Sequence, residues 1–118
     1  MASPRACSVT SLATPIRKTA TFQVRREGLP KALAAIREFV EYVRANERDG
    51  TLRYESWQET DDATKFVHLF TFRDAEAERI HSSSAAVERF TQVLYPLCLE
   101  PVTFTDFSIV ASTEAKPS

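Results

Sequence analysis

The sequence has little of what several common functional sites require. Its two glycines, Gly28 and Gly50, are too few and too far apart for a phosphate-binding glycine loop. Its two cysteines, Cys7 and Cys98, are also far apart, and this spacing gives neither a disulfide framework nor a zinc signature. We therefore expect free thiols in a reducing cytoplasm and no bound metal.

Charge of one sign is not concentrated anywhere in the chain. The 15 basic and 16 acidic side chains leave a formal net charge of −1, and no basic stripe is present that could follow a line of phosphates. The chain has no run of about 18 apolar residues, so no transmembrane helix is expected. The segment around Arg5 has no apolar core like that of a signal peptide. These features predict a cytoplasmic protein that binds neither nucleic acid nor a membrane.

The length and the ends of the chain indicate one domain with two tails. A chain of 118 residues suits a single domain. Residues 1–18 contain prolines, serines, threonines and basic residues without a period, which predicts a flexible N-terminal tail. An ordered arm that embraces a partner subunit is the alternative. We expect the folded domain to cover residues 19–111 and a second tail to cover residues 112–118.

The alternation of apolar and polar residues predicts strands over 19–26, 51–59, 66–72 and 102–110. Apolar residues at spacings of three and four predict a helix that begins near Pro30 and ends before the Asp49-Gly50 turn. Asp74 can cap a short helix, and a run of serines at 82–84 separates it from a second helical segment. The order β-α-β-β-α-β is an α+β, ferredoxin-like topology, with helices on one face of an antiparallel sheet.

The strand expected over 66–72 is apolar on both of its faces. A strand of this kind is covered on both sides, and the helices of one chain cover one side of such a sheet. A second copy of the sheet is the economical cover for the other side. We therefore expect a homodimer that forms through the sheet face.

Three stretches of the sequence carry a family likeness. The first, 47–54, has an acidic residue, a glycine and a tyrosine that lead into a strand, and the second, 70–77, has a strand exit followed by a helix cap. The third begins with His81 and a serine and continues through Phe90 and a proline-leucine pair to Pro101. Together they resemble the antibiotic biosynthesis monooxygenase (ABM) superfamily, whose members are dimeric α+β barrels.

The resemblance implies a homodimer with a pocket in each subunit between helices and sheet. Some members are cofactor-independent monooxygenases that oxidise aromatic polyketides or quinols with dioxygen; others degrade haem, isomerise small sugar-like phosphates or have no known activity. The haem-degrading branch has an asparagine on strand one and a tryptophan ten positions before the helix histidine, where this sequence has Gln23 and Thr71. The resemblance therefore implies a protein without a cofactor that binds a small aromatic or hydrophobic ligand.

His81 occupies the position of the family's helix histidine, and the resemblance makes it the candidate catalytic base. Histidine titrates near neutral pH. A cofactor-independent oxygenase needs a base, because the electron-rich substrate anion is what reduces dioxygen. The alternative is a structural histidine that bonds a carboxylate or a backbone carbonyl near the break between the two helices.

Five further residues are candidate substrate contacts: Trp57, His68, Tyr54, Phe22 and Phe90. Trp57 would stack on a flat substrate, or else be buried against the helices or at a dimer interface. His68 would project a polar group into an apolar pocket, or else be a satisfied core histidine. We expect the other three, with Phe39 and Tyr95, to belong to the core first and to the pocket lining second.

Three hypotheses follow from these residues. The first is a cofactor-independent monooxygenase that acts on a small phenolic, quinol or polyketide-like aromatic, with His81 as the base. The second is a non-catalytic dimer that binds a small ligand or serves as a structural module, and the third is an isomerase on the same scaffold. If the aromatic side chains fill the space between helices and sheet, the enzyme and binding hypotheses both fail. An open cavity with His81 pointing into it favours the enzyme.

Overall fold

The computed structural model describes residues 14–114, and the order of its elements is the one expected from the sequence. The elements are β1 (Ile16–Gln23), η1 (Arg26–Gly28), α2 (Leu29–Asn46), β2 (Thr51–Gln58), β3 (Lys65–Phe72), α3 (Ala75–Ser82), α4 (Ala85–Leu94), η2 (Tyr95–Leu97) and β4 (Thr103–Phe107). The fold is therefore the predicted α+β, ferredoxin-like arrangement. Residues 1–13 of the N-terminal tail expected over 1–18, and the last four residues of the C-terminal tail, lie outside the described part.

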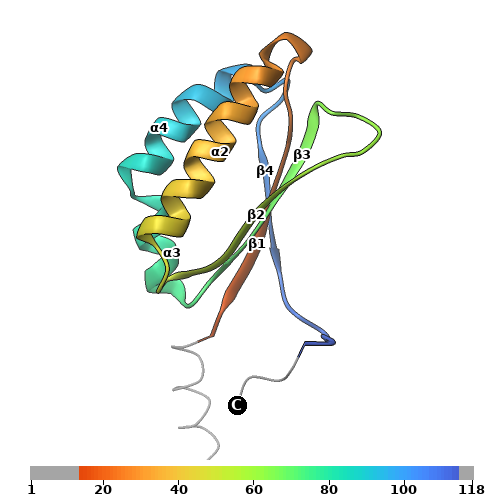
Figure 1. Cartoon of the computed structure of the whole chain (residues 1–118). Helices are drawn as coiled ribbons and strands as arrows, with labels where there is room; N and C mark the ends of the chain where they lie inside the picture. The colour runs from red at the N-terminus through yellow and green to blue at the C-terminus, as the bar shows by residue number, and fades with distance from the viewer. Residues whose placement is uncertain (1–13, 115–118) are drawn as a thin grey trace, which may run out of the picture.

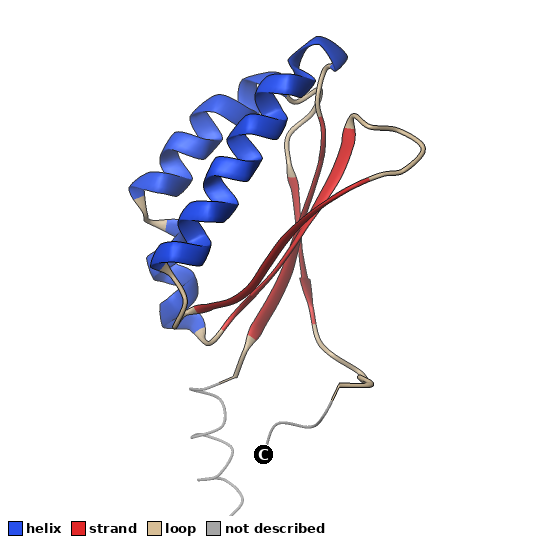
Figure 2. Cartoon of the chain, in the orientation of Figure 1, coloured by secondary structure: helices blue, strands red, loops and turns tan. Residues whose placement is uncertain are grey.

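The four strands form one antiparallel sheet in the order β2-β3-β1-β4. Within residues 14–114, all helices lie on one side of this sheet, and the other side carries none of them (Figure 1). Colouring by secondary structure shows the same two layers, with α2 and α4 running side by side (Figure 2). The one-sided cover predicted for the sheet is thus present in this chain.

A proline and two capping side chains determine where the helices begin. Pro30 stands in the first turn of α2, where a missing N–H costs nothing. The carboxylate of Asp74 accepts a hydrogen bond from the Ala77 N–H at 2.9 Å and so caps α3. The Ser84 hydroxyl caps α4 in the same way, by accepting from the Val87 N–H at 3.1 Å. The break between α3 and α4 follows from this second cap.

Three strand boundaries differ from the predicted ones by three residues. β1 ends at Gln23 rather than at residue 26, because η1 begins at Arg26. β1 begins at Ile16, so its first three residues belong to the sheet rather than to a tail, because Ile16 pairs with Phe72 of β3. β4 ends at Phe107, which pairs with Arg17 near the start of β1. Residues beyond it have no neighbouring strand left to pair with. Pairing with distant strands determines where β1 begins and where β4 ends. The local alternation of apolar and polar residues does not contain this information.

The core lies between the helices and the covered face of the sheet. Alternate residues of β3 point into it, namely Phe66, His68, Phe70 and Phe72, and all four are buried. Helix α2 contributes Ala32, Ile36, Phe39 and Val43 from its buried stripe. No helix among residues 14–114 is both long and apolar enough to span a membrane.

Candidate functional site

A cavity of about 260 Å³ lies between the helices and the sheet. Its lining is mostly aromatic and includes Phe22, Phe39, Tyr54, Phe70, Phe72 and Phe90. Ala20 of β1 opens the space, because its small side chain stands beside His68 in a row of larger ones. A cavity of about 150 Å³ holds benzene, so this one has room for one or two fused rings. The aromatic side chains therefore line the space without filling it.

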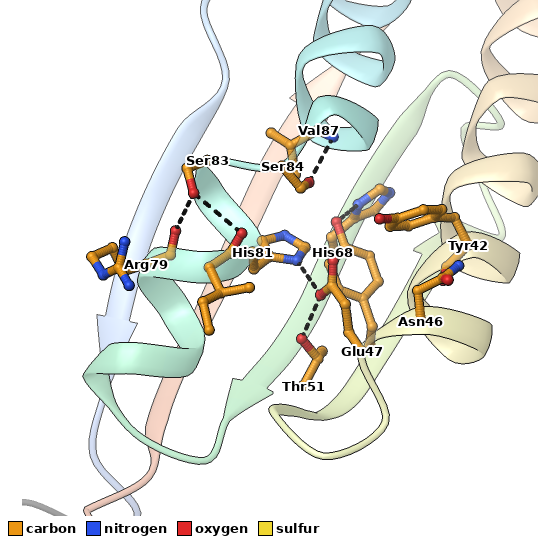
Figure 3. A network of polar contacts seen from close by, with 12 residues as sticks. Tyr42, Asn46, Glu47, Thr51, His68, Arg79, His81, Ser83, Ser84 and Val87 are labelled. Atoms are coloured by element: carbon orange, nitrogen blue, oxygen red, sulfur yellow. Dashed lines mark hydrogen bonds and ion pairs between the residues drawn. The ribbon is translucent and has the colours of Figure 1, made fainter.

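His81 comes from α3, lines the cavity and is buried. Its Nδ1 lies 2.7 Å from Oε1 of Glu47, as Figure 3 shows. The same oxygen accepts a hydrogen bond of 2.7 Å from the Thr51 hydroxyl. The ring also packs against Phe39 and Phe72, with ring centroids 5.7 and 5.0 Å away. Both readings of His81 in the sequence are compatible with this arrangement, since the residue bonds a carboxylate and also faces the cavity.

The loop after α2 holds Glu47 in place. The Glu47 N–H donates to the Val43 carbonyl, and its own carbonyl accepts from the Thr51 N–H at 2.8 Å. The Arg73 N–H donates to the Gly50 carbonyl at 2.7 Å, which ties the loop to the end of β3. A Cβ at position 50 would lie 3.0 Å from the Ala77 Cβ, so glycine lets this loop pack closely on α3. Contacts with α2, with the start of β2 and with the segment between β3 and α3 therefore hold the backbone of Glu47 and its loop in place.

His68 lies in the middle of β3 and is almost completely buried, with 1% of its surface exposed. Burial lowers its pKa to about 4, so the ring is neutral at neutral pH. Its Nδ1 lies 3.0 Å from the hydroxyl of Tyr54, whose own pKa is raised, mainly by burial. Among the described residues, His68 Nε2 is a buried side-chain nitrogen without a hydrogen-bond partner. An orphaned nitrogen of this kind is costly to bury, and a polar atom of a ligand would satisfy it.

Charged side chains stand at the edge of the cavity nearest to β4. Lys18 Nζ lies 2.5 Å from Glu78 of α3 and 3.6 Å from Asp106 of β4. The hydrogen bond to Glu78 is the main reason that the pKa of Lys18 is raised, which keeps the amine charged. Phe104 borders the same edge and is 57% exposed. The cavity therefore has a polar rim and an aromatic interior.

The structure brings five of the six predicted site residues together. His81, His68, Tyr54, Phe22 and Phe90 all line the cavity. Trp57 does not, because it pairs with Val67 on the opposite face of the sheet. There it is half exposed, and its indole N–H donates to Glu55. The prediction that Trp57 stacks on a substrate in this cavity is not supported by that position.

Sequence reasoning did not select Glu47 as a site residue. It stood in one of the stretches that carry the family likeness, but its contact with His81 spans 34 positions. Lys18 was missed as well, because it was assigned to the tail. Within residues 14–114, no group of three or more histidine, cysteine, aspartate or glutamate side chains is arranged to hold a metal ion.

Residues 15–93, more than half of the chain, match the family model described as antibiotic biosynthesis monooxygenase. The chain belongs to the ABM family. Its match to solved structures shows the same fold. A protein from Nitrosomonas europaea, provisionally described as an antibiotic biosynthesis monooxygenase, is 17% identical with a TM-score of 0.76, and the match covers 86% of this chain and 96% of that one.

Two further solved structures have similar identities and TM-scores. A Caulobacter crescentus protein with the same provisional description is 15% identical with a TM-score of 0.77, over 90% of this chain and 99% of that one. The PA3566 protein of Pseudomonas aeruginosa is 23% identical with a TM-score of 0.73, over 85% of this chain and 98% of that one. At these identities the likeness concerns the fold alone. A comparison with curated proteins found no match.

Proposed function

We propose that this ABM-family protein is a cofactor-independent monooxygenase that oxidises a small phenolic, quinol or polyketide-like aromatic with dioxygen. The observation that carries the proposal is the open aromatic cavity with two histidines in its wall. One of them, His81, is held by a carboxylate, and the other, His68, has an unsatisfied buried nitrogen. Family membership supports the reaction class and leaves the substrate open.

The proposed reaction needs no external reductant. An activated CH₂ or CH of the aromatic substrate loses a proton, and the resulting anion transfers electrons to dioxygen. A C–O bond forms, and the O–O bond then breaks. For a CH₂ group, the products are a C=O group and one water. For the ring CH of a phenol or quinol, the ring itself supplies the remaining electrons, and the products are a quinone that carries the new oxygen and one water. Both oxygen atoms of O₂ are accounted for in each case. The protein therefore has to supply a base, a dry cavity and a hydrogen bond to the developing oxyanion.

His81 is placed to act as the base in this scheme. Because Nδ1 faces Glu47, the other ring nitrogen, Nε2, is left for the cavity side. The carboxylate fixes the orientation of the ring and stabilises the imidazolium that forms when Nε2 takes a proton. The aromatic contacts to Phe39 and Phe72 restrict the ring further.

His68 is placed to bind the substrate oxygen. The Tyr54 hydroxyl has no other hydrogen-bond acceptor within residues 14–114, so we infer that it donates to His68 Nδ1. The proton of the neutral imidazole then sits on Nε2, which can donate to a ligand oxygen. Tyr54 and His68 would thus form a hydrogen-bonded anchor beside the His81–Glu47 pair, since the Tyr54 and His81 ring centroids lie 5.8 Å apart.

The functional unit in this proposal is a homodimer formed through the uncovered face of the sheet. That face carries Val67 and Leu69 of β3 with Trp57 of β2 beside Val67, and it also carries Phe107 of β4, which lies beyond Arg17 of β1. Trp57 and Phe107 are each at least half exposed in the single chain. A second copy would cover these apolar groups.

Oxygen consumption tests the proposal directly. Purified protein is mixed with a panel of hydroquinones, which fit the cavity, and of anthrones, whose third ring would extend to the rim of the cavity. Dioxygen uptake is compared with that of each compound in buffer without protein. We expect uptake with at least one compound, and we expect His81→Ala to lower kcat by about 10²–10⁴-fold, as loss of a general base does. Lys31 is exposed on α2, so Lys31→Ala serves as the control and should leave the rate of dioxygen uptake unchanged.

The alternative functions give different results in the same assay. A ligand-binding module would bind a panel compound without consuming dioxygen in either the wild type or His81→Ala. An isomerase would convert its substrate equally well under argon. Uptake that His81→Ala does not reduce would contradict the role given to the histidine.

A further inference from the structure

The pair formed by His81 and Glu47 stands in a wall between two hollows of the molecule. His81 lines the inner aromatic cavity, whereas Glu47 lines a separate outer cleft of about 550 Å³. Residues 45–51, Arg73, Ala77 and Ile80 form this outer cleft. Neither member of the pair borders the other's hollow. Their 2.7 Å contact therefore connects the two hollows through the wall.

The two carboxylate oxygens of Glu47 have different surroundings. Oε1 is in hydrogen-bond contact with both Nδ1 of His81 and the Thr51 hydroxyl. Oε2 makes no hydrogen bond to any residue in the described part of the chain, and yet it is not among the fully buried atoms without a partner there. It therefore keeps accessible surface. Because Glu47 lines the outer cleft and not the inner cavity, we infer that this surface faces the outer cleft.

The geometry points to Glu47 as the group through which the His81 ring exchanges protons with solvent, by way of the outer cleft. This inference deepens the proposed function, because it gives the base a proton route of its own. A ligand in the inner cavity would lie between His81 and the rim at Lys18 and Glu78. Water would then be kept from the ring on that side, and the Glu47 side would stay open.

The proposed steps are proton transfers only. A proton that arrives at Nε2 makes the ring an imidazolium, the Nδ1 proton moves to Glu47, and the carboxylic acid releases it to water in the outer cleft. The reverse sequence reprotonates the ring. Glu47 is thus a positioning residue that also carries protons, and it does not touch the substrate.

The charged and titratable groups around the pair come from several elements. Arg48 and Asp49 of the loop after α2 and Arg73 after β3 line the outer cleft. On the inner side, Tyr54 of β2 and the Lys18–Glu78 ion pair line the cavity. Arg48 and Arg73 thus give the outer cleft two positively charged side chains.

Ring-proton exchange measured by NMR tests the route without any turnover. The chain has two histidines, so the ring signals of ¹⁵N-histidine-labelled protein are assigned with a single His68→Gln variant. We expect Glu47→Gln to slow solvent exchange of the His81 Nδ1 proton by at least tenfold. Its amide oxygen keeps the hydrogen bond but cannot accept the proton. Asp49→Asn removes a carboxylate from the same cleft without touching His81, and it should leave the rate within about twofold.

If Glu47 only holds the His81 ring in place, Glu47→Gln should change the exchange rate of the Nδ1 proton in the opposite direction. Loss of the charged acceptor would loosen the ring, and the Nδ1 proton would exchange faster in Glu47→Gln. An unchanged or faster rate overturns the route. If Glu47→Gln does not fold, Glu47→Asp is measured instead, because its shorter side chain widens the gap between the carboxylate and His81 Nδ1. The Nδ1 proton should exchange more slowly if Glu47 carries protons and faster if Glu47 only holds the ring.

The two proposals fail in separate ways. If the wild type consumes no dioxygen with any compound but exchange slows in Glu47→Gln, the proton route stands and the monooxygenase proposal falls. If dioxygen is consumed and Glu47→Gln does not slow exchange, the route falls and the monooxygenase proposal stands. Where turnover is found, the route further predicts that Glu47→Gln lowers kcat by about tenfold with little change in KM.

Discussion

Glu47 Oε1 lies 2.7 Å from His81 Nδ1, although 34 positions separate the two residues in the chain. The carboxylate follows the last turn of α2, and the histidine stands near the end of α3. The sheet does not carry either residue, although α2 packs on β2 and α3 packs on β2 and β3. Contact between them therefore depends on how closely the loop after α2 packs on α3.

Gly50 sets that packing, and its replacement should be costly. In Gly50→Ala, the new Cβ would lie 3.0 Å from the Ala77 Cβ, an atom that cannot move away without its helix. We expect a loss of about 1–3 kcal/mol in the free energy of unfolding, as for overpacking elsewhere. Urea unfolding measures the loss, and a shifted His81 ring signal should accompany it.

Gly28→Ala is the matched control for this change. Its Cβ would also meet an atom at 3.0 Å, but that atom is the Leu97 Cδ2, the far end of a side chain that can turn aside. We expect a smaller loss and an unmoved His81 signal. Equal losses in the two variants would contradict the role assigned to Gly50.

His68 should make the stability of the protein fall in mild acid. Burial lowers its pKa from 6.5 to about 4, so between these values the unfolded chain binds more protons than the folded one. The contribution of the neutral ring is fully present above about pH 6.5 and is lost as the pH falls toward 4. Linkage gives a loss of about 2–3 kcal/mol by pH 4.5.

Urea unfolding at pH 7.0 and at pH 4.5 measures this dependence. Other groups titrate in the same range, so the informative quantity is the difference between the wild type and His68→Gln. The variant should lose about 2–3 kcal/mol less than the wild type on going to pH 4.5. Parallel pH curves for the two proteins would show that His68 is not buried as a neutral ring.

Ala20 controls the size of the cavity. Ala20→Leu places three additional carbons over the cavity floor beside His68, in space that is now empty. We expect the free energy of unfolding to change by less than about 1.5 kcal/mol, because no packed neighbour has to move. Binding of 2-naphthol, followed by calorimetry, should weaken at least tenfold.

Ala34→Leu provides the comparison for the cavity variant. Ala34 is exposed on α2, so the same change in side chain occurs there without touching the cavity. Wild-type affinity in this variant, together with lost affinity in Ala20→Leu, would locate the bound aromatic between helices and sheet. Unchanged binding in Ala20→Leu would place it elsewhere.

Most of the fold could be predicted because its signals are local. The cap at Asp74 and the spacing of apolar residues along α2 each involve a few neighbouring positions. The start of β1 could not be predicted in this way, since Ile16 joins the sheet through its pairing with Phe72. Such a boundary depends on how far the partner strand extends, which the local pattern does not contain.

The candidate site was predictable to the extent that side chains alternate along strands. Alternation puts His68 on the aromatic face of its strand, and the structure finds it in the cavity wall. The same rule puts Tyr54 and Trp57 on opposite faces of β2, so the two could not line one cavity. Glu47 lay beyond such rules, because its distance from His81 is set by a loop and two helices together.

The uncovered face of the sheet leads to the last prediction, a homodimer that a single charge disrupts. Leu69 stands in the middle of β3 on that face, opposite Glu55 of β2 and Thr19 of β1. Sedimentation should give the wild type a mass of about twice 13.3 kDa. Leu69→Arg should shift it to the monomer, because removing a guanidinium from water between two sheets costs several kcal/mol even with the Glu55 carboxylate opposite it.

Ala34→Arg is the control for the added charge. It places the same guanidinium on the exposed face of α2, away from the sheet, and should leave the dimer intact. The folded state of Leu69→Arg can be checked by its circular dichroism, since the outward face of the sheet is not part of the core. A wild type that sediments as a monomer, or a Leu69→Arg variant that remains a dimer, would mean that these sheets do not pack on each other. The apolar face formed by Val67, Leu69 and Trp57 would then need a different cover.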